Sequence, residues 1–193
     1  SMTFLQIIAL RIAGMQTFDS ICHAFTTMPT GGFSTKNASI AHFDSALIHY
    51  IIMFFMFIAG INFSLHFRLI SGDFKAYVKD AEFRVYLFIT LVITTIVFIS
   101  LSFENNIFSS QGLKESLFNT VAILTSTGFV LGDYEAWPVF VQMILLTLMF
   151  IGGMGGSTTG GMKVIRVLLL VKYAVLETRR MLHSRALIPV KIG

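Results

Sequence analysis

Apolar residues run in long, nearly unbroken stretches along this chain, and short polar or glycine-rich segments separate them. Three stretches are long enough to cross a bilayer, which takes about 20 predominantly apolar residues. They cover 45–70, 83–103 and, with one interruption, 136–176. The opening stretch, 2–14, is too short, and we interpret it as the outer end of a further span that begins upstream. The pattern predicts an all-α membrane protein that crosses the bilayer several times.

A glycine-rich segment interrupts the third stretch. Six glycines lie within residues 152–161, and a glycine inside a helix costs about 1 kcal/mol relative to alanine, so the helix must break there. Irregular backbone at membrane depth is tolerated only where it is buried in protein or lines a water-filled cavity. The segment therefore predicts a polar cavity inside the membrane, and with it a transport pathway.

The chain contains two copies of one unit. An acidic residue followed by serine precedes a Gly-Phe pair at the same separation in both halves: Asp19 before Gly32, and Glu115 before Gly128. A Met-Phe-Ile-x-Gly motif then follows in the next apolar stretch of each half. Such a repeat predicts an architecture of span, short helix, glycine loop and span. The two copies occupy residues 1–80 and 81–193, and the second ends in a basic cytoplasmic tail.

Each copy contains a short helix that cannot cross the bilayer, at 18–27 and 113–124. The acidic residue and the serine at each start suit a helix N-terminus by charge and by capping. Each helix ends in a cluster of Thr, Ser and Gly. Because the apolar stretches before and after meet this segment from the outer side, the segment must enter the membrane and return. The pattern predicts a re-entrant pore loop in each copy.

The chemistry of these loops suits a cation. A short helix that points its C-terminal end inward places the negative end of its dipole at the pore axis. Carbonyl oxygens of the following residues can replace the hydration shell of an ion, as in the T-V-G-Y-G loops of potassium channels. The present loops lack the second glycine of that motif, which predicts a shorter and less selective filter. A single Thr-Gly-Phe loop would be interpreted as an ordinary turn between helices. Two such loops at matched positions favour a filter.

Composition and charge agree with a bilayer environment. Mean hydropathy is +0.79 and 12% of residues are charged, about half of the usual fraction. Basic residues gather at 68–84 and after the broken helix, so these regions are expected in the cytoplasm, and 104–115 and 133–137 outside. The basic clusters adjoin membrane helices and have no base-stacking platform beside them, which argues against nucleic-acid binding. The single Cys22 excludes an internal disulfide.

Three segments resemble the bacterial Trk/Ktr potassium-uptake family, in particular its TrkH-type membrane subunit: 30–35, 125–129 and above all 150–166. The resemblance extends over essentially the whole chain. Members of this family carry four span–pore loop–span repeats around one pseudo-fourfold pore. The resemblance implies that this chain holds the end of the second repeat's first span, the rest of that repeat and the whole third repeat.

The resemblance also implies a setting and partners. The chain is expected in the lipid bilayer of a bacterial inner membrane as a multi-pass homodimer. A cytoplasmic nucleotide-binding regulatory ring of the TrkA type is the expected partner. Potassium is the expected transported ion, without a cofactor and without enzymatic activity.

Individual residues follow from the same resemblance. The family's K⁺-binding filter corresponds to Thr30, Gly31, Gly32, Phe33, Ser126, Thr127, Gly128 and Phe129. The family's intramembrane gate corresponds to Gly152, Gly153, Gly155, Gly156, Ser157, Thr158, Thr159, Gly160 and Gly161. The gate departs from the family pattern at Thr159, where a third glycine is expected. A carbonyl ring needs oxygens from about four sides of the ion, so two loops alone are not expected to conduct.

Two alternatives belong to other classes. A broken-helix secondary transporter would bind its substrate at the glycine-rich loop, but such transporters lack paired pore loops. An intramembrane enzyme could use Ser157 as nucleophile with a histidine base, yet none of the five histidines has a spacing that specifies a base or a metal site. We expect His66 to pack between helices, and Asn62 and Asn119 to bridge helices rather than face the cavity.

Overall fold

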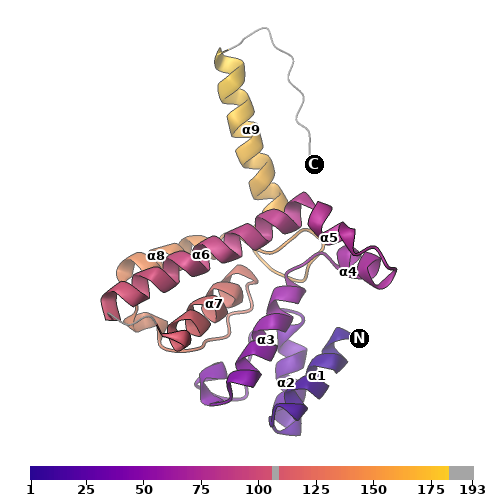
Figure 1. Cartoon of the computed structure of the whole chain (residues 1–193), viewed down its shortest axis with the longest axis vertical. Coiled ribbons are helices and arrows are strands. Elements are labelled where there is room, and N and C mark those ends of the chain that lie inside the picture. Colours follow the sequence, from indigo (N-terminus) through magenta and orange to yellow (C-terminus); the bar gives the residue numbers. More distant parts are fainter. Residues whose placement is uncertain (106–108, 183–193) are drawn as a thin grey trace.

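The computed structural model describes residues 1–105 and 109–182, and the regular secondary structure of this part is helical, apart from one isolated β-bridge. Two groups of helices, one from each half of the chain, lie side by side (Figure 1). The last helix, α9, points away from both groups (Figure 1). The all-α prediction is confirmed for the described residues.

The first group contains three helices and a 3₁₀ turn. Helix α2 follows the predicted 18–27 within one residue, and the loop after it leads through the turn into α3. The elements are α1 (Met2–Ile12), α2 (Thr17–Thr27), η1 (Ser39–His42) and α3 (Ala46–Ala59).

The second group repeats this order and extends it. Helix α6 contains the predicted span 83–103, and the predicted break after α8 is present, because no helix covers residues 152–161. The elements are α6 (Ala81–Asn105), α7 (Ser110–Leu124), η2 (Tyr134–Ala136), α8 (Val139–Leu148) and α9 (Val164–Leu182).

The stretch 45–70 is not one straight span, contrary to the prediction. Helix α3 ends at Ala59, and α4 (Phe63–Ile70) continues at an angle of 101°. The side chain of Asn62 accepts a hydrogen bond from the Ser64 N–H at 2.9 Å and so caps α4. Asn62 was expected to bridge helices, but it starts one instead. The short α5 (Lys75–Lys79) then leads into α6.

Fewer helices qualify as spans by length and apolarity than the sequence suggested. Within the described residues, Ala81–Phe103 qualifies by itself, and the bent pair α3 and α4 qualifies if it is counted as one broken span. The third predicted span is divided, because α8 contains 10 residues before the glycine-rich segment begins. Helix α8 is therefore too short to qualify as a span, and α9, with 19 residues, carries too many charged side chains.

The predicted helix starts are wrong in detail. The hydroxyls of Ser20 and Ser116 donate to the carbonyls of Gln16 and Gly112, at 2.8 and 2.7 Å, instead of capping a helix. A serine inside a helix can bond back to the carbonyl four residues earlier. The cap of α7 is Ser109, whose hydroxyl accepts from the Gly112 N–H at 3.0 Å, so α7 begins three residues earlier than predicted.

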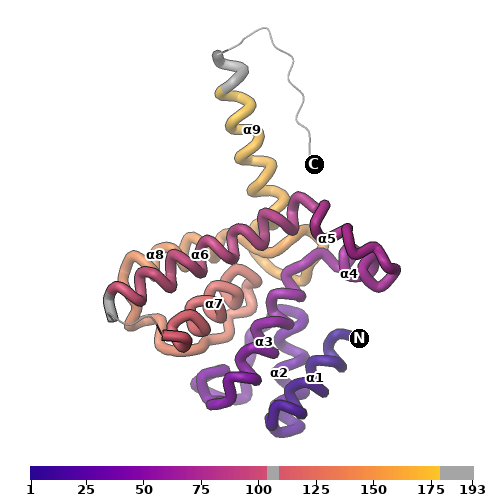
Figure 2. The backbone as a smooth tube through the Cα atoms, in the orientation of Figure 1, coloured from indigo at the N-terminus to yellow at the C-terminus, as the bar shows by residue number. Residues whose placement is uncertain are grey.

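The two copies share one apolar core. Leu10, Ile52 and Met56 of the first copy are fully buried together with Phe118 of the second. A second cluster surrounds the buried Tyr86 of α6 and includes Met154 of the glycine-rich segment. Figure 2 follows this segment, in orange, to the place where α3, α5 and α6 meet. The core therefore fixes the glycine-rich segment against both copies.

Candidate functional site

The loop after α2 begins with a hydrogen-bonded turn that closes the helix. The Gly31 N–H donates to the Thr26 carbonyl at 2.7 Å, and the Thr30 N–H donates to the Thr27 carbonyl at 3.0 Å. This pair of bonds is the Schellman motif, which satisfies carbonyls left free at a helix C-terminus. We refer to residues 30–33 as the first Gly-Phe loop.

The loop after α7 has the same turn. The Thr127 N–H donates to the Ala122 carbonyl and the Ser126 N–H to the Ile123 carbonyl, both at 2.9 Å. We refer to residues 126–129 as the second Gly-Phe loop. The two copies therefore agree in the hydrogen bonding of this turn as well as in sequence.

Both loops carry backbone strain at matched positions. Thr30 and Ser126 both adopt a φ of 56°, in the left-handed region. Glycine is the usual residue at this point of the motif, and another residue costs roughly 1–2 kcal/mol there. Two residues later, Gly32 and Gly128 adopt a φ of 69° and 77°. Strain of this kind concentrates at functional sites.

The two loops touch each other. A Cβ atom on Gly32 would collide with the carbonyl oxygen of Thr127, so this contact requires glycine. Gly128 has open space at the corresponding position and lines a cavity of about 460 Å³. The two aromatic residues differ: Phe33 is 77% exposed, whereas Phe129 is 2% exposed. The structure thus brings the predicted filter residues of the two copies together.

The glycine-rich loop, residues 152–161, is closed at its neck by backbone bonds. The Gly152 N–H donates to the Met162 carbonyl at 2.9 Å, and the Met162 N–H donates to the Phe150 carbonyl at 3.1 Å. Gly152 lies against the carbonyl of Gly160, where a side chain would collide. The loop is a defined fold rather than a loose connection, because both of its ends are paired.

This loop contacts both Gly-Phe loops. The Thr158 hydroxyl donates to the carbonyls of Met28 and Ala59, at 2.9 and 3.2 Å. The Thr30 hydroxyl donates to the Thr158 carbonyl at 3.1 Å. On the other side, Gly160 lies against the side chain of Ser126. The predicted gate and the predicted filter residues are therefore in direct contact.

Glu82 anchors the glycine-rich loop from α6. Its Oε1 atom accepts from the Gly155 N–H at 2.7 Å and from the Ile165 N–H at 2.9 Å. Ile165 lies in the first turn of α9, where a carboxylate satisfies free N–H groups and the helix dipole. Sequence reasoning missed this buried residue. The available signal was a single carboxylate at the start of the predicted span 83–103.

Lys163 and Thr159 stabilise the loop from within. The Lys163 ammonium donates to the carbonyl and the hydroxyl of Thr159, and its distances to the carbonyl and hydroxyl oxygens of Ser157 are 3.4 Å. The Thr159 hydroxyl also accepts from the Gly153 N–H at 2.9 Å. Thr159 has no positive φ, so a side chain fits where the family resemblance predicted glycine.

His66 supports the bend between α3 and α4. Its Nε2 lies 3.1 Å from the Ile58 carbonyl, and its Nδ1 lies 2.6 Å from the Tyr77 hydroxyl. Since a carbonyl can only accept, Nε2 carries the proton and Tyr77 donates to Nδ1. Burial raises the pKa of Tyr77, which keeps this donor protonated. His66 packs between helical segments, as the sequence predicted.

The oxygens of the two Gly-Phe loops themselves are neutral. Among residues 1–105 and 109–182, no group of three or more His, Cys, Asp and Glu could hold a metal ion. Ser157, the nucleophile of the enzyme alternative, donates to the Met154 carbonyl at 2.6 Å and lies 2.8 Å from the Thr159 hydroxyl. Backbone carbonyls and hydroxyls are thus the groups that a cation would meet at the loops.

Comparison with known proteins gives consistent matches. A family model described as TrkH, cation transport protein, matches residues 2–193. The Trk system potassium uptake protein TrkH of Salmonella typhimurium is 43% identical over 189 residues. This match covers 96% of the chain and 39% of the relative. The TrkH protein of Vibrio parahaemolyticus is 42% identical over 197 residues, which covers 100% of the chain and 41% of the relative.

A solved structure matches over nearly the whole chain. The crystal structure of the potassium transporter TrkH from Vibrio parahaemolyticus superposes with a TM-score of 0.94 at 42% sequence identity. The match covers 99% of this chain and 42% of that chain. The chain thus spans about two fifths of the length of the relatives it matches.

Proposed function

Because the chain belongs to the TrkH family of cation transport proteins, we propose that it forms part of a potassium-uptake pathway across the membrane. The family and the relatives named above are transporters and not enzymes, which excludes the intramembrane enzyme. In this proposal, K⁺ loses water at the two Gly-Phe loops and then meets the glycine-rich loop, which gates the pathway.

The pairing of the Gly-Phe loops carries the proposal. Both follow a short helix, share one hydrogen-bonding pattern and alternate positive with negative φ. Such alternation turns successive peptide carbonyls toward one side, whereas in a regular strand they alternate between opposite sides. Oxygens on one side of the chain are what a dehydrated cation requires. Thr30 and Ser126 also support the proposal. Both adopt a strained left-handed backbone without being glycine, and strain of this kind clusters at functional sites.

The position of the glycine-rich loop supports the gate. Thr158 contacts the end of α2, and Gly160 lies against Ser126 of the second Gly-Phe loop. An ion that leaves the proposed filter therefore meets this loop next. Hydrogen bonds of Glu82 and Lys163 hold the loop in this position.

The secondary-transporter alternative is less well supported. It requires the glycine-rich loop itself to bind the substrate. The oxygens of Ser157 and Thr159, which could bind a cation there, already accept hydrogen bonds from the Lys163 ammonium. A substrate would have to displace this charge. The paired Gly-Phe loops also have no role in that alternative.

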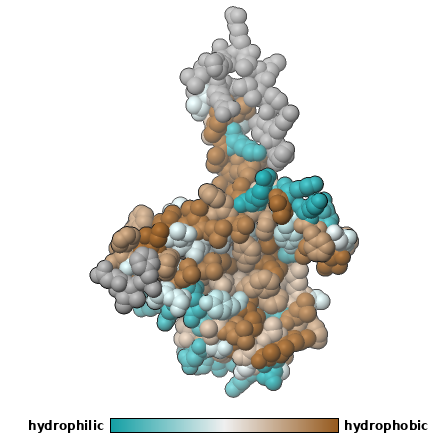
Figure 3. Space-filling model, viewed as in Figure 1, coloured by the Kyte–Doolittle hydropathy of each residue, from teal (hydrophilic) through white to brown (hydrophobic). Residues whose placement is uncertain are grey.

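The setting of the pathway follows from the family and the surface. This is a membrane protein, and large apolar side chains remain exposed on α6 and α8, among them Phe88, Leu91 and Phe140. Figure 3 shows extensive hydrophobic surface over the helices. We propose that this surface faces lipid of a bacterial inner membrane. In the same proposal the complete protein is a homodimer with four pseudo-fourfold repeats and a TrkA-like cytoplasmic partner.

Reconstitution tests the proposed function. The complete protein is placed in liposomes, and K⁺ and Na⁺ uptake are measured separately in wild type and in Gly32→Ala. Since a side chain at Gly32 collides with Thr127, the variant is expected to lose the preference for K⁺. An inserted variant with wild-type uptake of both ions would refute the filter.

A further inference from the structure

His23 of α2 and Asn119 of α7 occupy the same position in the two copies, four residues after Asp19 and Glu115 respectively. Both side chains are buried, at 0% and 2% exposure. Each reaches two partners: a carbonyl of its own helix, and the chain that leaves its Gly-Phe loop. This agreement in geometry, with different residue types, points to a shared task.

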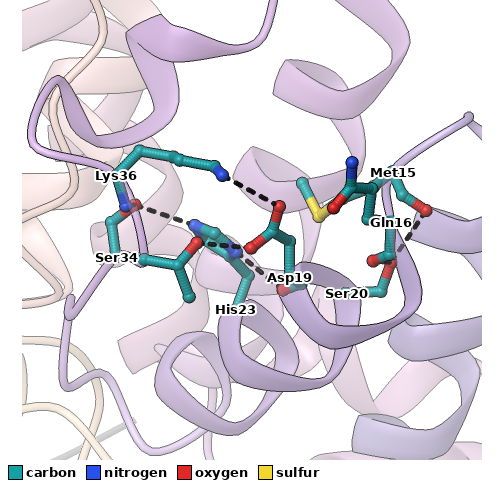
Figure 4. Close-up of polar contacts among 8 residues, drawn as sticks. Met15, Gln16, Asp19, Ser20, His23, Ser34 and Lys36 are labelled. Carbon is teal, nitrogen blue, oxygen red and sulfur yellow. Dashed lines mark hydrogen bonds and ion pairs between the residues drawn. The ribbon is translucent and has the colours of Figure 1, made fainter.

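His23 links its helix to the exit of the first Gly-Phe loop (Figure 4). Its Nδ1 donates to the Asp19 carbonyl at 2.7 Å, since a carbonyl can only accept. Its Nε2 then accepts from the Ser34 hydroxyl at 2.9 Å, in the neutral tautomer. The Lys36 N–H donates to the same hydroxyl oxygen at 3.1 Å. The imidazole therefore fixes the chain immediately after Gly32 and Phe33.

Asp19 strengthens this connection on the same side of the loop. Its carboxylate accepts from the Thr35 hydroxyl at 2.6 Å and lies 3.5 Å from the Lys36 ammonium (Figure 4). Three consecutive residues, 34–36, are thus bonded to one turn of α2. Asp19 lies in the first turn of α2, as the sequence predicted, and its carboxylate also holds the loop exit.

Asn119 makes the corresponding connection in the second copy. Its Nδ2 donates to the Glu115 carbonyl at 3.1 Å and to the Leu131 carbonyl at 2.6 Å. Its Oδ1 accepts from the Leu131 N–H at 3.2 Å. The amide therefore pairs with both backbone groups of Leu131. It was expected to bridge helices, but it connects a helix to the exit of the second Gly-Phe loop.

His23 also contacts the second copy. Its ring centroid lies 5.8 Å from that of Phe129 and 5.4 Å from that of Phe43. The imidazole thus lies between the two Gly-Phe loops: it bonds to the exit of the first and packs against the aromatic residue of the second. A change at His23 can therefore alter both loops.

We propose that His23 and Asn119 are positioning residues that set the spacing of the filter carbonyls and so the preference for K⁺ over Na⁺. The inference rests on the proposed function. Each Gly-Phe loop is held at its start by the Schellman motif and at its exit by His23 or Asn119, so the strained residues between are fixed from both ends. Without the second attachment the loop relaxes, and carbonyls then adapt to the smaller ion.

Exchange of the two residue types provides the test. The complete protein carries His23→Ala, His23→Asn or Asn119→Ala, and K⁺ and Na⁺ uptake into liposomes are measured. Both alanine variants are expected to lower the K⁺:Na⁺ uptake ratio roughly fivefold or more, because each removes at least one hydrogen bond to the loop exit. His23→Asn is expected to recover most of the ratio, because asparagine performs this task in the second copy. His42→Ala, an exposed histidine outside the connection, is the matched control.

A second variant keeps the test decisive if His23→Ala does not fold. Ser34→Ala removes the partner hydroxyl and leaves the histidine in place, and it should lower the ratio similarly, with the exposed Ser71→Ala as control. A folded Ser34→Ala or His23→Ala protein with the wild-type ratio overturns the positioning role.

Gly128→Ser in the same assay separates the positioning role of His23 and Asn119 from the filter role of the Gly-Phe loops. If Gly128→Ser lowers the ratio while the histidine variants do not, only the positioning role fails. If neither changes the ratio, the filter itself is wrong.

Discussion

The Thr158 hydroxyl lies 2.9 Å from the carbonyl oxygen of Met28, a residue 130 positions earlier in the chain. Met28 closes α2, so its carbonyl is one of those left without a partner inside that helix. The same hydroxyl lies 3.2 Å from the Ala59 carbonyl at the end of α3. One side chain of the glycine-rich loop thus serves the C-terminal ends of two helices in the other copy.

Removal of this hydroxyl is expected to loosen the proposed gate. Thr158→Val keeps the shape of the side chain but cannot donate to Met28 or Ala59. Each lost hydrogen bond weakens the closed loop by about 1 kcal/mol, so K⁺ flux through the complete protein should rise roughly fivefold or more. The K⁺:Na⁺ ratio should not change, because the Gly-Phe loops stay intact. Flux assays in liposomes measure both quantities.

The matched control for this variant is Thr95→Val. Thr95 is exposed on α6 and its hydroxyl bonds to the Leu91 carbonyl of the same helix, so it tests the removal of a threonine hydroxyl away from the loop. Flux that stays at the wild-type level in Thr158→Val, with normal insertion, would mean that this contact does not restrain the loop.

Shortening the glycine-rich loop should have a larger effect of the same kind. A deletion of residues 155–158 removes Thr158 and the Gly155 contact with Glu82, while the neck bonds of Gly152 and Met162 can still form. We expect higher K⁺ conductance with an unchanged preference for K⁺, since the filter lies elsewhere. Single-channel recording or liposome flux measures this. A shortened protein that inserts normally and conducts no faster would favour a purely structural break.

Glu82 is expected to contribute to stability through its charge. In Glu82→Gln the carboxamide oxygen can still accept from Gly155 and Ile165, but hydrogen bonds to a charged group are stronger by about 1 kcal/mol. The variant should therefore unfold at a temperature several degrees lower, as measured by thermal denaturation in detergent. Glu135→Gln, at an exposed position, is the control. Equal unfolding temperatures for Glu82→Gln and wild type would show that the charge of Glu82 is not needed.

Local sequence signals predicted much of the helical pattern. The end of α2 depends on the threonines, proline and glycines that follow it, and the break after α8 depends on its glycines. Both were predicted closely. The bend at Gly60 was missed because the apolar run continues through it. A Cβ at Gly60 would collide with the Tyr86 hydroxyl, which lies far away in sequence. The bend thus depends on tertiary packing that hydrophobic periodicity does not report.

Some residues of the candidate site could likewise be predicted from the sequence, and others required the structure. Gly32 and Gly128 were identifiable because the motif repeats, but the contact of Gly32 with Thr127 joins the two copies and required the structure. Glu82 and Lys163 are single charged residues that act on backbone groups of a distant loop or on nearby hydroxyls. A lone charge near a membrane span has no spacing to mark it, so the sequence alone did not identify either residue.

The glycines of the Gly-Phe loops give the most direct test of ion selection. Gly128 adopts a φ of 77° with open space where a Cβ would lie, so Gly128→Ser meets backbone strain and no collision. The strain is about 1 kcal/mol, enough to shift the adjoining carbonyls, and the K⁺:Na⁺ uptake ratio of the complete protein should fall. Gly32→Ser should reduce it further, because its side chain also collides with the Thr127 carbonyl.

Gly14→Ser distinguishes a specific effect from general strain. Gly14 has a φ of 95° and equally open surroundings, but it precedes α2, at the opposite end of that helix from the first Gly-Phe loop. It should lower stability by a similar amount and leave the uptake ratio unchanged. If Gly14→Ser reduced the ratio as much as Gly128→Ser, general destabilisation would explain both results. If Gly128→Ser kept the wild-type ratio at normal expression, Gly128 would have no part in ion selection, and the second Gly-Phe loop would be a structural turn.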